Sequence, residues 1–306
     1  MTNPTQLENA LCGISGILVT PFDDKGEIAP DKLVPILDRA IGAGMHLPVV
    51  NGNTGEFYAL TTDEACAMAR AVVDLVDGRA PVLAGVGRGL RDAQVLAKVS
   101  ADAGAAALMV HQPPDPFVSP RGLVDYLNAI NDASGGLPMM LYLRNDAIGT
   151  AAIAKLCAVP GVKGVKWATP NPLKLADAIA ACDPGITWVG GLAEVWAPTF
   201  YAVGARGFTS GLINVWPERS LAIHAALEAG DYSKANRLIT GMRAFEDIRA
   251  EEMNGTNVTG VKAALQALGQ DCGPTRPPAA WPLTDAQQQH LTTFLTDNKL
   301  TTGVPA

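Results

Sequence analysis

Short apolar segments alternate with longer amphipathic segments along most of the chain. Eight of the short segments are bounded by glycine, proline or polar residues, as is typical of strands that are buried on both faces. Between them, stretches such as 30–43, 62–76 and 90–103 carry apolar residues at helical spacing. The predicted strands are residues 13–19, 46–51, 81–86, 106–111, 138–143, 162–167, 187–191 and 207–210.

This alternation predicts an α/β fold. Eight strands in β-α order before residue 211 fit a closed parallel (β/α)8 TIM barrel better than an open sheet. A dinucleotide-binding open sheet is disfavoured, because no GxGxxG follows the first strand and the glycines of residues 85–89 lack that spacing.

The pattern changes after the last predicted strand, where only helical signals occur. We predict that residues 1–225 form the catalytic barrel and that residues 226–306 form a C-terminal helical extension packed on it. The helical signals that follow the last strand cover residues 217–229, 232–249, 258–268 and 285–298.

Composition narrows the classes of partner. The 306 residues carry a formal charge of −7 and a pI near 5.1, which argues against nucleic acid or an anionic membrane as the main partner. The five cysteines are scattered without a CxxC pair, so neither a zinc site nor a disulfide framework is predicted. The N-terminus resembles no signal peptide, and no apolar run of about 18 residues occurs. We therefore expect a cytoplasmic protein.

Barrel enzymes take their catalytic groups from the carboxyl ends of the strands. In the sixth strand, Lys166 alternates with Val165 and Trp167, so it is expected to point into the barrel while its apolar neighbours face the helices. Burial lowers the pKa of a lysine and produces a nucleophilic amine near neutral pH. The alternative is a structural lysine that pairs with a barrel carboxylate.

The fifth strand supplies two further candidates. Tyr142 has the alternation to face the interior one strand from Lys166, where it could transfer protons; the less favoured alternative is a core tyrosine whose hydroxyl group is satisfied by a hydrogen bond. Arg144 could bind a carboxylate with two hydrogen bonds or pair with Asp146.

The second strand runs into residues 51–57, in which two glycines flank polar residues. Such a turn can present backbone N–H and hydroxyl groups to a carboxylate, although a polar loop that binds nothing would look similar. The four histidines show no HxH or HExxH spacing, so no metal site is predicted. His111, at the end of the fourth strand, could line the pocket.

Three separated motifs together resemble one known family. GNTGE (52–56), LYLRN (141–145) and GVKGVK (161–166) have the order and spacing of the dihydrodipicolinate synthase / N-acetylneuraminate lyase family. The segments GILVTPF (16–22) and GFTSGLINVWPE (207–218) are similar too, so that the resemblance covers essentially the whole chain.

The resemblance implies a Schiff-base (β/α)8 lyase that needs no metal or organic cofactor and forms a homotetramer or homodimer. It implies Lys166 as the Schiff-base lysine and Tyr142 as the proton-transfer residue. Substrate binding would fall to residues of the second-strand turn and of the loops after strands seven and eight, namely Gly52, Asn53, Thr54, Gly55, Gly191 and Ile213.

The chain also departs from the synthases of that family. They carry a second tyrosine after strand four, where this chain has Pro114, and an arginine five residues beyond the strand-five tyrosine, where it has Ala147. Arg144, together with GP-x-RPP at 273–278, is similar to the 5-dehydro-4-deoxyglucarate dehydratase branch. That branch usually has glycine where Asn53 stands.

The leading hypothesis is a lyase, dehydratase or aldolase, that acts on pyruvate or a 2-keto-3-deoxy sugar acid through an imine on Lys166. Arg144 is a candidate for the distal acidic or hydroxylated end of the substrate. One alternative is a 4-hydroxy-tetrahydrodipicolinate synthase, which condenses pyruvate with aspartate semialdehyde. An alternative of another class is a catalytically silent barrel that binds a keto acid.

Overall fold

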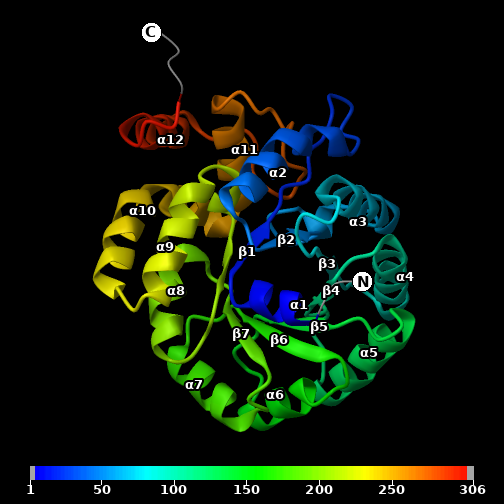
Figure 1. The fold of residues 1–306 in the computed structure, drawn as a ribbon. Coiled ribbons are helices and arrows are strands. Elements are labelled where there is room, and N and C mark those ends of the chain that lie inside the picture. The colour runs from blue at the N-terminus through cyan, green and yellow to red at the C-terminus, as the bar shows by residue number, and fades with distance from the viewer. Residues whose placement is uncertain (1–3, 302–306) are drawn as a thin grey trace.

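The computed structural model describes residues 4–301 and contains a closed parallel barrel. Its strands pair in sequence order, and β1 pairs with β8 to complete the ring (Figure 1). Each strand overlaps one predicted segment, so the predicted barrel is confirmed. The strands are β1 (Ile14–Ile17), β2 (Leu47–Val50), β3 (Leu83–Val86), β4 (Ala107–His111), β5 (Met139–Leu143), β6 (Val162–Trp167), β7 (Thr187–Gly190) and β8 (Phe208–Ser210).

Eight helices follow the strands one by one and cover the outside of the barrel (Figure 1). The eighth ends at Glu228, slightly beyond the boundary at residue 225 that the sequence suggested. These helices are α2 (Val34–Ala43), α3 (Thr62–Val76), α4 (Leu90–Ala103), α5 (Pro120–Ala133), α6 (Thr150–Cys157), α7 (Pro172–Ala181), α8 (Ala193–Ala202) and α9 (Pro217–Glu228).

Local sequence signals set the ends of these helices. The side chain of Thr61 accepts a hydrogen bond from the backbone of Glu64, whose carboxylate accepts one from the Thr61 N–H, and this capping box begins α3. Gly44 and Gly104 end α2 and α4 in the left-handed conformation that glycine adopts most easily.

The barrel has two apolar cores. One lies between the strands and the surrounding helices, and the other fills the barrel interior. Helix α1 (Pro4–Leu11), which the sequence pattern did not predict, lies across the N-terminal end of the barrel (Figure 1). Its Leu7 and Leu11 belong to the interior core and close that end. The opposite end, where the strands finish, is left for a site.

As far as residue 301, the C-terminal extension contains three helices beside α8, α9 and α2 (Figure 1). They are α10 (Tyr232–Asn254), α11 (Asn257–Ala267) and α12 (Asp285–Asp297), and all three were predicted. The backbone of α10 leaves helical geometry at Glu251, where ψ is 163°, and the chain then turns into α11. This break brings the ends of α10 and α11 to the carboxyl end of the barrel.

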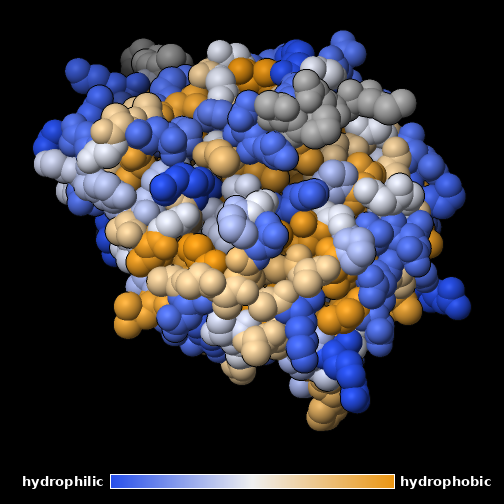
Figure 2. All heavy atoms as spheres, turned by 60° about the horizontal axis from the view of Figure 1, so that its bottom comes forward, coloured by the Kyte–Doolittle hydropathy of each residue, from blue (hydrophilic) through white to orange (hydrophobic). Residues whose placement is uncertain are grey.

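The outer surface around α6 and α7, at the bottom of Figure 1, mixes hydrophilic and apolar side chains (Figure 2). On this face the hydrophilic side chains are dispersed among apolar ones. Within residues 4–301, no helix is both long enough and apolar enough to span a bilayer.

Candidate active site

Strand register places two of the predicted catalytic side chains next to each other. Lys166 on β6 is the register partner of Tyr142 on β5, and both side chains point into the barrel near its carboxyl end. A β-bulge at the start of β6 leaves Lys163 exposed. Beyond the bulge, Gly164 and Lys166 face inward, whereas Val165 lies in the outer core. The bulge therefore sets the alternation that turns Lys166 inward.

Lys166 is a buried amine in a weakly polar environment. Its side chain is 3% exposed, and its ammonium lies 4.0 Å from the centroid of the Tyr142 ring. Burial, together with the positive charge of Arg144, lowers the pKa of Lys166 to about 7. Within residues 4–301 no carboxylate forms an ion pair with it. A large share of the amine is therefore uncharged at neutral pH, as a nucleophile requires.

Tyr142 is held by a side chain from the loop after β2. This loop, residues 51–57, is the one predicted to bind a carboxylate and is called the carboxylate loop. The Asn53 amide donates a hydrogen bond of 2.9 Å to the Tyr142 hydroxyl oxygen. Burial raises the pKa of Tyr142 to about 12, so its hydroxyl stays protonated at neutral pH. Because Asn53 occupies the oxygen as a donor, the phenolic proton remains available for donation to another group.

The loop after β2 folds tightly against β1. A Cβ on Gly52 would lie 2.4 Å from the Ile17 side chain, and a Cβ on Gly55 would lie 2.9 Å from the Leu18 carbonyl oxygen, so the loop needs glycine at both positions. The N–H groups of Asn53 and Thr54 bond to no residue among those described. Both residues line the cavity, so these N–H groups and the Thr54 hydroxyl can bind an anion there.

The same loop is held in place by the C-terminal extension. Glu56 forms a buried ion pair of 2.6 Å with Lys262 of α11, and its second oxygen accepts a hydrogen bond of 2.8 Å from the Arg276 backbone. Arg276 also pairs with Glu64 at 2.6 Å. The extension is thus part of the support of the site.

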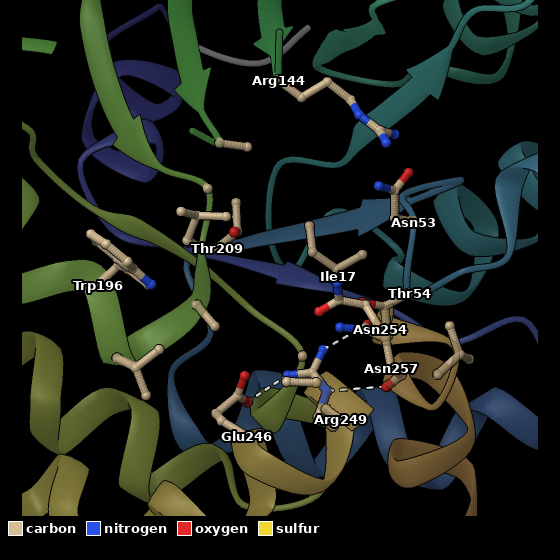
Figure 3. Close-up of a pocket in the computed structure, with 18 of the residues that line it drawn as sticks. Ile17, Asn53, Thr54, Arg144, Trp196, Thr209, Glu246, Arg249, Asn254 and Asn257 are labelled. Carbon is tan, nitrogen blue, oxygen red and sulfur yellow. Dashed lines mark hydrogen bonds and ion pairs between the residues drawn. The ribbon is translucent and has the colours of Figure 1, made fainter. Parts of the chain in front are cut away.

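Arg144 lies at the edge of the site and extends toward Asn53 (Figure 3). Its guanidinium has no ion-pair partner within residues 4–301. Asp146, the alternative partner considered from sequence, pairs instead with Lys174 at 3.5 Å.

The turn after β8 is supported by a buried carboxyl group. Glu194 accepts hydrogen bonds of 2.5 Å from Ser210 and 2.6 Å from Ser220, and burial raises its pKa to about 7. The Ser210 hydroxyl in turn accepts a hydrogen bond of 2.9 Å from the Ile213 N–H. Ile213 is therefore buried behind the turn and does not line the cavity, whereas Gly191 does.

His111 is buried beneath the carboxylate loop and does not line the main cavity. Its ring stacks on Phe57 with centroids 4.4 Å apart, and its Nε2 donates to the Asn51 carbonyl at 2.8 Å. Burial lowers the pKa of His111 to about 3, so the ring is neutral. Its position indicates a structural role.

The site opens into a cavity of about 680 Å³. Several of its lining residues were not identified from the sequence: Trp196 of α8, Thr209 of β8, and Arg249 and Asn257 of the extension (Figure 3). The rule that barrel sites form at strand ends could have identified Trp196 and Thr209. No local signal identifies Arg249, because only the path of α10 brings it to the barrel. Residues 4–301 contain no cluster of three or more side chains suited to a metal ion.

A (β/α)8 barrel with a buried lysine of lowered pKa, a protonated tyrosine and a turn of unpaired N–H groups at its carboxyl end defines a class of protein. It is the architecture of barrel enzymes that bind an anionic carbonyl compound beside a nucleophilic amine.

Comparison with known proteins identifies the family. Residues 10–298 match the dihydrodipicolinate synthetase family. The "Probable 5-dehydro-4-deoxyglucarate dehydratase" of Rhizobium rhizogenes is 30% identical over 94% of this chain and 95% of its own length. The "4-hydroxy-tetrahydrodipicolinate synthase" of Maridesulfovibrio salexigens is 33% identical over 83% of this chain and 87% of its own length. A crystal structure of dihydrodipicolinate synthase from Oceanobacillus iheyensis superposes with a TM-score of 0.91 at 36% identity and covers 96% of this chain and 98% of that chain.

The chain therefore belongs to the dihydrodipicolinate synthetase family. Members of this family are Schiff-base lyases that act on small keto acids, and this chain is an enzyme of that type. Its relatives include both dehydratases and synthases.

Proposed function

We propose that this enzyme is a dehydratase or aldolase that acts on a 2-keto-3-deoxy sugar acid through an imine on Lys166. One observation carries the proposal: a lysine with a pKa of about 7 lies directly beside a tyrosine that stays protonated. In this scheme the substrate carboxylate binds to the N–H groups of Asn53 and Thr54. The nearby Arg144 contributes a positive charge that attracts a carboxylate of the substrate.

The reaction begins when the uncharged Lys166 amine attacks the C2 carbonyl carbon. The resulting carbinolamine loses water with a proton from Tyr142 and becomes an iminium ion, which withdraws electrons from C3. In a dehydratase the iminium ion loses a proton from C3 to give an enamine, and the enamine expels the protonated C4 hydroxyl group as water and becomes an iminium ion again. In an aldolase the C4 hydroxyl loses its proton, and the C3–C4 bond breaks to release an aldehyde and leave the enamine. Protonation of that enamine at C3 restores the iminium ion. Hydrolysis of the imine then releases the product and frees Lys166.

The synthase alternative has weaker support at residue level. The loop after β4 carries Pro114 where the synthases carry a second tyrosine, and Ala147 stands where they carry an arginine. Arg144, two residues after Tyr142, is instead similar to the 5-dehydro-4-deoxyglucarate dehydratase branch. We therefore prefer the dehydratase or aldolase reading. Location in the cytoplasm, action without a cofactor, and assembly as a homotetramer or homodimer stay predictions.

Trapping of the imine tests the proposal. Reduction with borohydride in the presence of pyruvate should add one reduced pyruvyl group to the wild-type chain, detected by intact mass and mapped to Lys166. The Lys166→Met variant, which keeps the length and burial of the side chain, should add none. Lys163→Met is the matched control, because this neighbouring lysine is exposed and should leave the adduct unchanged. The proposal is contradicted if the wild-type chain forms no adduct or if the adduct persists in Lys166→Met. Either result favours the alternative of a catalytically silent barrel that binds a keto acid.

A further inference from the structure

The cavity is larger than pyruvate needs and extends from Lys166 toward the C-terminal extension. Asn53 and Thr54 lie on one side of it, and Trp196 lies on the opposite side (Figure 3). A keto acid with its carboxylate at the loop and its C2 atom at Lys166 must therefore direct the rest of its chain toward Trp196 and α10. The side chains next to Trp196 and on α10 therefore determine which substrates fit, because they contact the part of the substrate farthest from its carboxylate and C2 atom, here called its tail.

One wall of the cavity is formed by α8, β8 and α10, and the charges on this wall neutralise one another. Arg249 is 4% exposed and forms an ion pair of 2.5 Å with Glu246. Its other donors bond to Asn257, at 3.1 Å to the backbone carbonyl and 3.0 Å to the side-chain oxygen. At the rim, Arg243 pairs with Asp247 at 2.8 Å. Two cations and two carboxylates thus give the wall a formal charge of zero.

The position of Arg249 leaves it little freedom to move. Its guanidinium packs against Gly211, where a Cβ would lie 2.4 Å from Nη2. Glu246 is 11% exposed, so its negative charge is screened only weakly by solvent. A second substrate carboxylate on this side would meet Glu246 and would find no unpaired cation.

The same wall offers uncharged polar groups and an aromatic face. Trp196 is stacked on Phe200 with centroids 5.7 Å apart, and its indole nitrogen points toward the cavity (Figure 3). Neither this N–H nor the hydroxyl group of Thr209 has a hydrogen-bond partner among residues 4–301. An aromatic face with nearby hydroxyl and amide groups suits a chain of carbons that bear hydroxyl groups.

From this wall we infer that the substrate is a monocarboxylic 2-keto-3-deoxy aldonic acid, whose uncharged hydroxylated tail binds between Trp196, Thr209 and the Arg249–Glu246 pair. The inference rests on the proposed function and adds the substrate class to it. It also separates this chain from relatives whose names specify 5-dehydro-4-deoxyglucarate, an acid with a carboxylate at each end. Apart from Lys166, which reacts with the carbonyl group, Arg144 is the one cation among the described lining residues that has no ion-pair partner, which matches a single carboxylate.

A matched pair of substrates tests the inference. One is a six-carbon 2-keto-3-deoxy aldonic acid, and the other is the corresponding aldaric acid, with a carboxylate in place of the terminal CH2OH. We expect kcat/KM to favour the aldonic acid by about tenfold or more, the size of effect that one unpaired charge in a buried site produces. Pyruvate trapping on Lys166 is run in parallel and tests the proposed function separately.

Two variants locate the effect in this wall. Glu246→Gln removes the carboxylate charge and leaves the Arg249 cation available, so the preference for the aldonic acid should fall by about tenfold. Trp196→Phe keeps an aromatic face but removes the N–H, and it should lower kcat/KM for the aldonic acid. Glu228→Gln on α9 is the control, because Glu228 is exposed and lies outside the cavity.

The outcomes separate the two claims. If the pyruvate adduct forms but the aldaric acid reacts as well as the aldonic acid, or neither reacts, the inference is wrong and the Schiff-base function stands. The inference is also wrong if Glu246→Gln forms the pyruvate adduct normally yet keeps the wild-type preference. Absence of the pyruvate adduct overturns the proposed function, and the inference fails with it.

Discussion

The reactivity of the site depends on one pKa. Lys166 is buried, and burial contributes more than the nearby Arg144 charge to the fall of its pKa from 10.5 to about 7. The desolvated amine is uncharged above that pH and protonated below it. A single side chain thus sets the pH range in which imine formation is fast.

The pH dependence of imine formation follows from this pKa. Below about pH 7 the rate of pyruvate trapping should fall about tenfold per pH unit, because only the uncharged amine attacks. In Arg144→Gln the loss of a neighbouring positive charge should raise the pKa of Lys166, so the acidic limb should move to higher pH. Stopped-time trapping between pH 5 and 10, quantified by intact mass, measures the position of that limb. A limb that stays in place shows that the Arg144 charge does not act on Lys166.

Site residues on the barrel strands could be predicted from the sequence, whereas a site residue that comes from the C-terminal extension could not. Lys166 and Tyr142 were identified because strand alternation fixes which way each side chain points, and parallel register then brings them together. Trp196 and Thr209 lie where strand-end loops belong, but Arg249 reaches the cavity only because α10 packs against the barrel. Such a contact depends on tertiary packing, which periodicity does not encode.

At the scale of elements, the carboxylate loop depends on a helix that is distant in sequence. The Glu56–Lys262 pair is almost fully buried, with side-chain exposures of 3% and 0%. Breaking such a pair leaves an uncompensated buried charge, which is more harmful than removal of the pair as a whole.

Lys262→Met should therefore destabilise the enzyme by about 3–5 kcal/mol and loosen the loop. Urea denaturation measures the first effect, and an increase in KM larger than the decrease in kcat measures the second. The double variant Glu56→Gln/Lys262→Met should recover much of the stability, because glutamine can still accept the hydrogen bond from the Arg276 backbone. A single variant as stable as the wild type would show that the pair does not support the loop.

Most elements were predictable because their signals are local. The strands of the barrel read as short apolar runs, and the helices between them show helical spacing with clear capping residues. Helix α1 was not predicted because it has only eight residues, too few for a clear helical pattern. Its apolar side chains are explained only by their contacts with the barrel interior, which the sequence does not show. The bulge at Lys163 was also missed, since it depends on the partner strand β5.

At the scale of the whole molecule, the barrel and the C-terminal extension pack directly against each other. The Phe22 N–H donates to the Cys272 carbonyl at 2.8 Å, and Arg276 lies over the Phe22 ring at 4.2 Å from its centroid. These contacts join the loop after β1 to the segment between α11 and α12. The division at residue 225 therefore separates two stretches of sequence that pack as one core.

We expect the chain to unfold in one cooperative transition, because removal of the extension would expose Phe22 and leave Glu56 without its partner. Trp281 is the one tryptophan beyond residue 225, and Trp216 contacts Phe294 of α12 with ring centroids 6.3 Å apart. In the double variant Trp216→Phe/Trp281→Phe the fluorescence therefore comes from the other three tryptophans, which all belong to the barrel. Its urea midpoint should coincide with that of far-UV circular dichroism, which reports on every helix. If the circular dichroism shows an earlier transition while the barrel fluorescence stays native, the extension unfolds independently, and the carboxylate loop does not need it to fold.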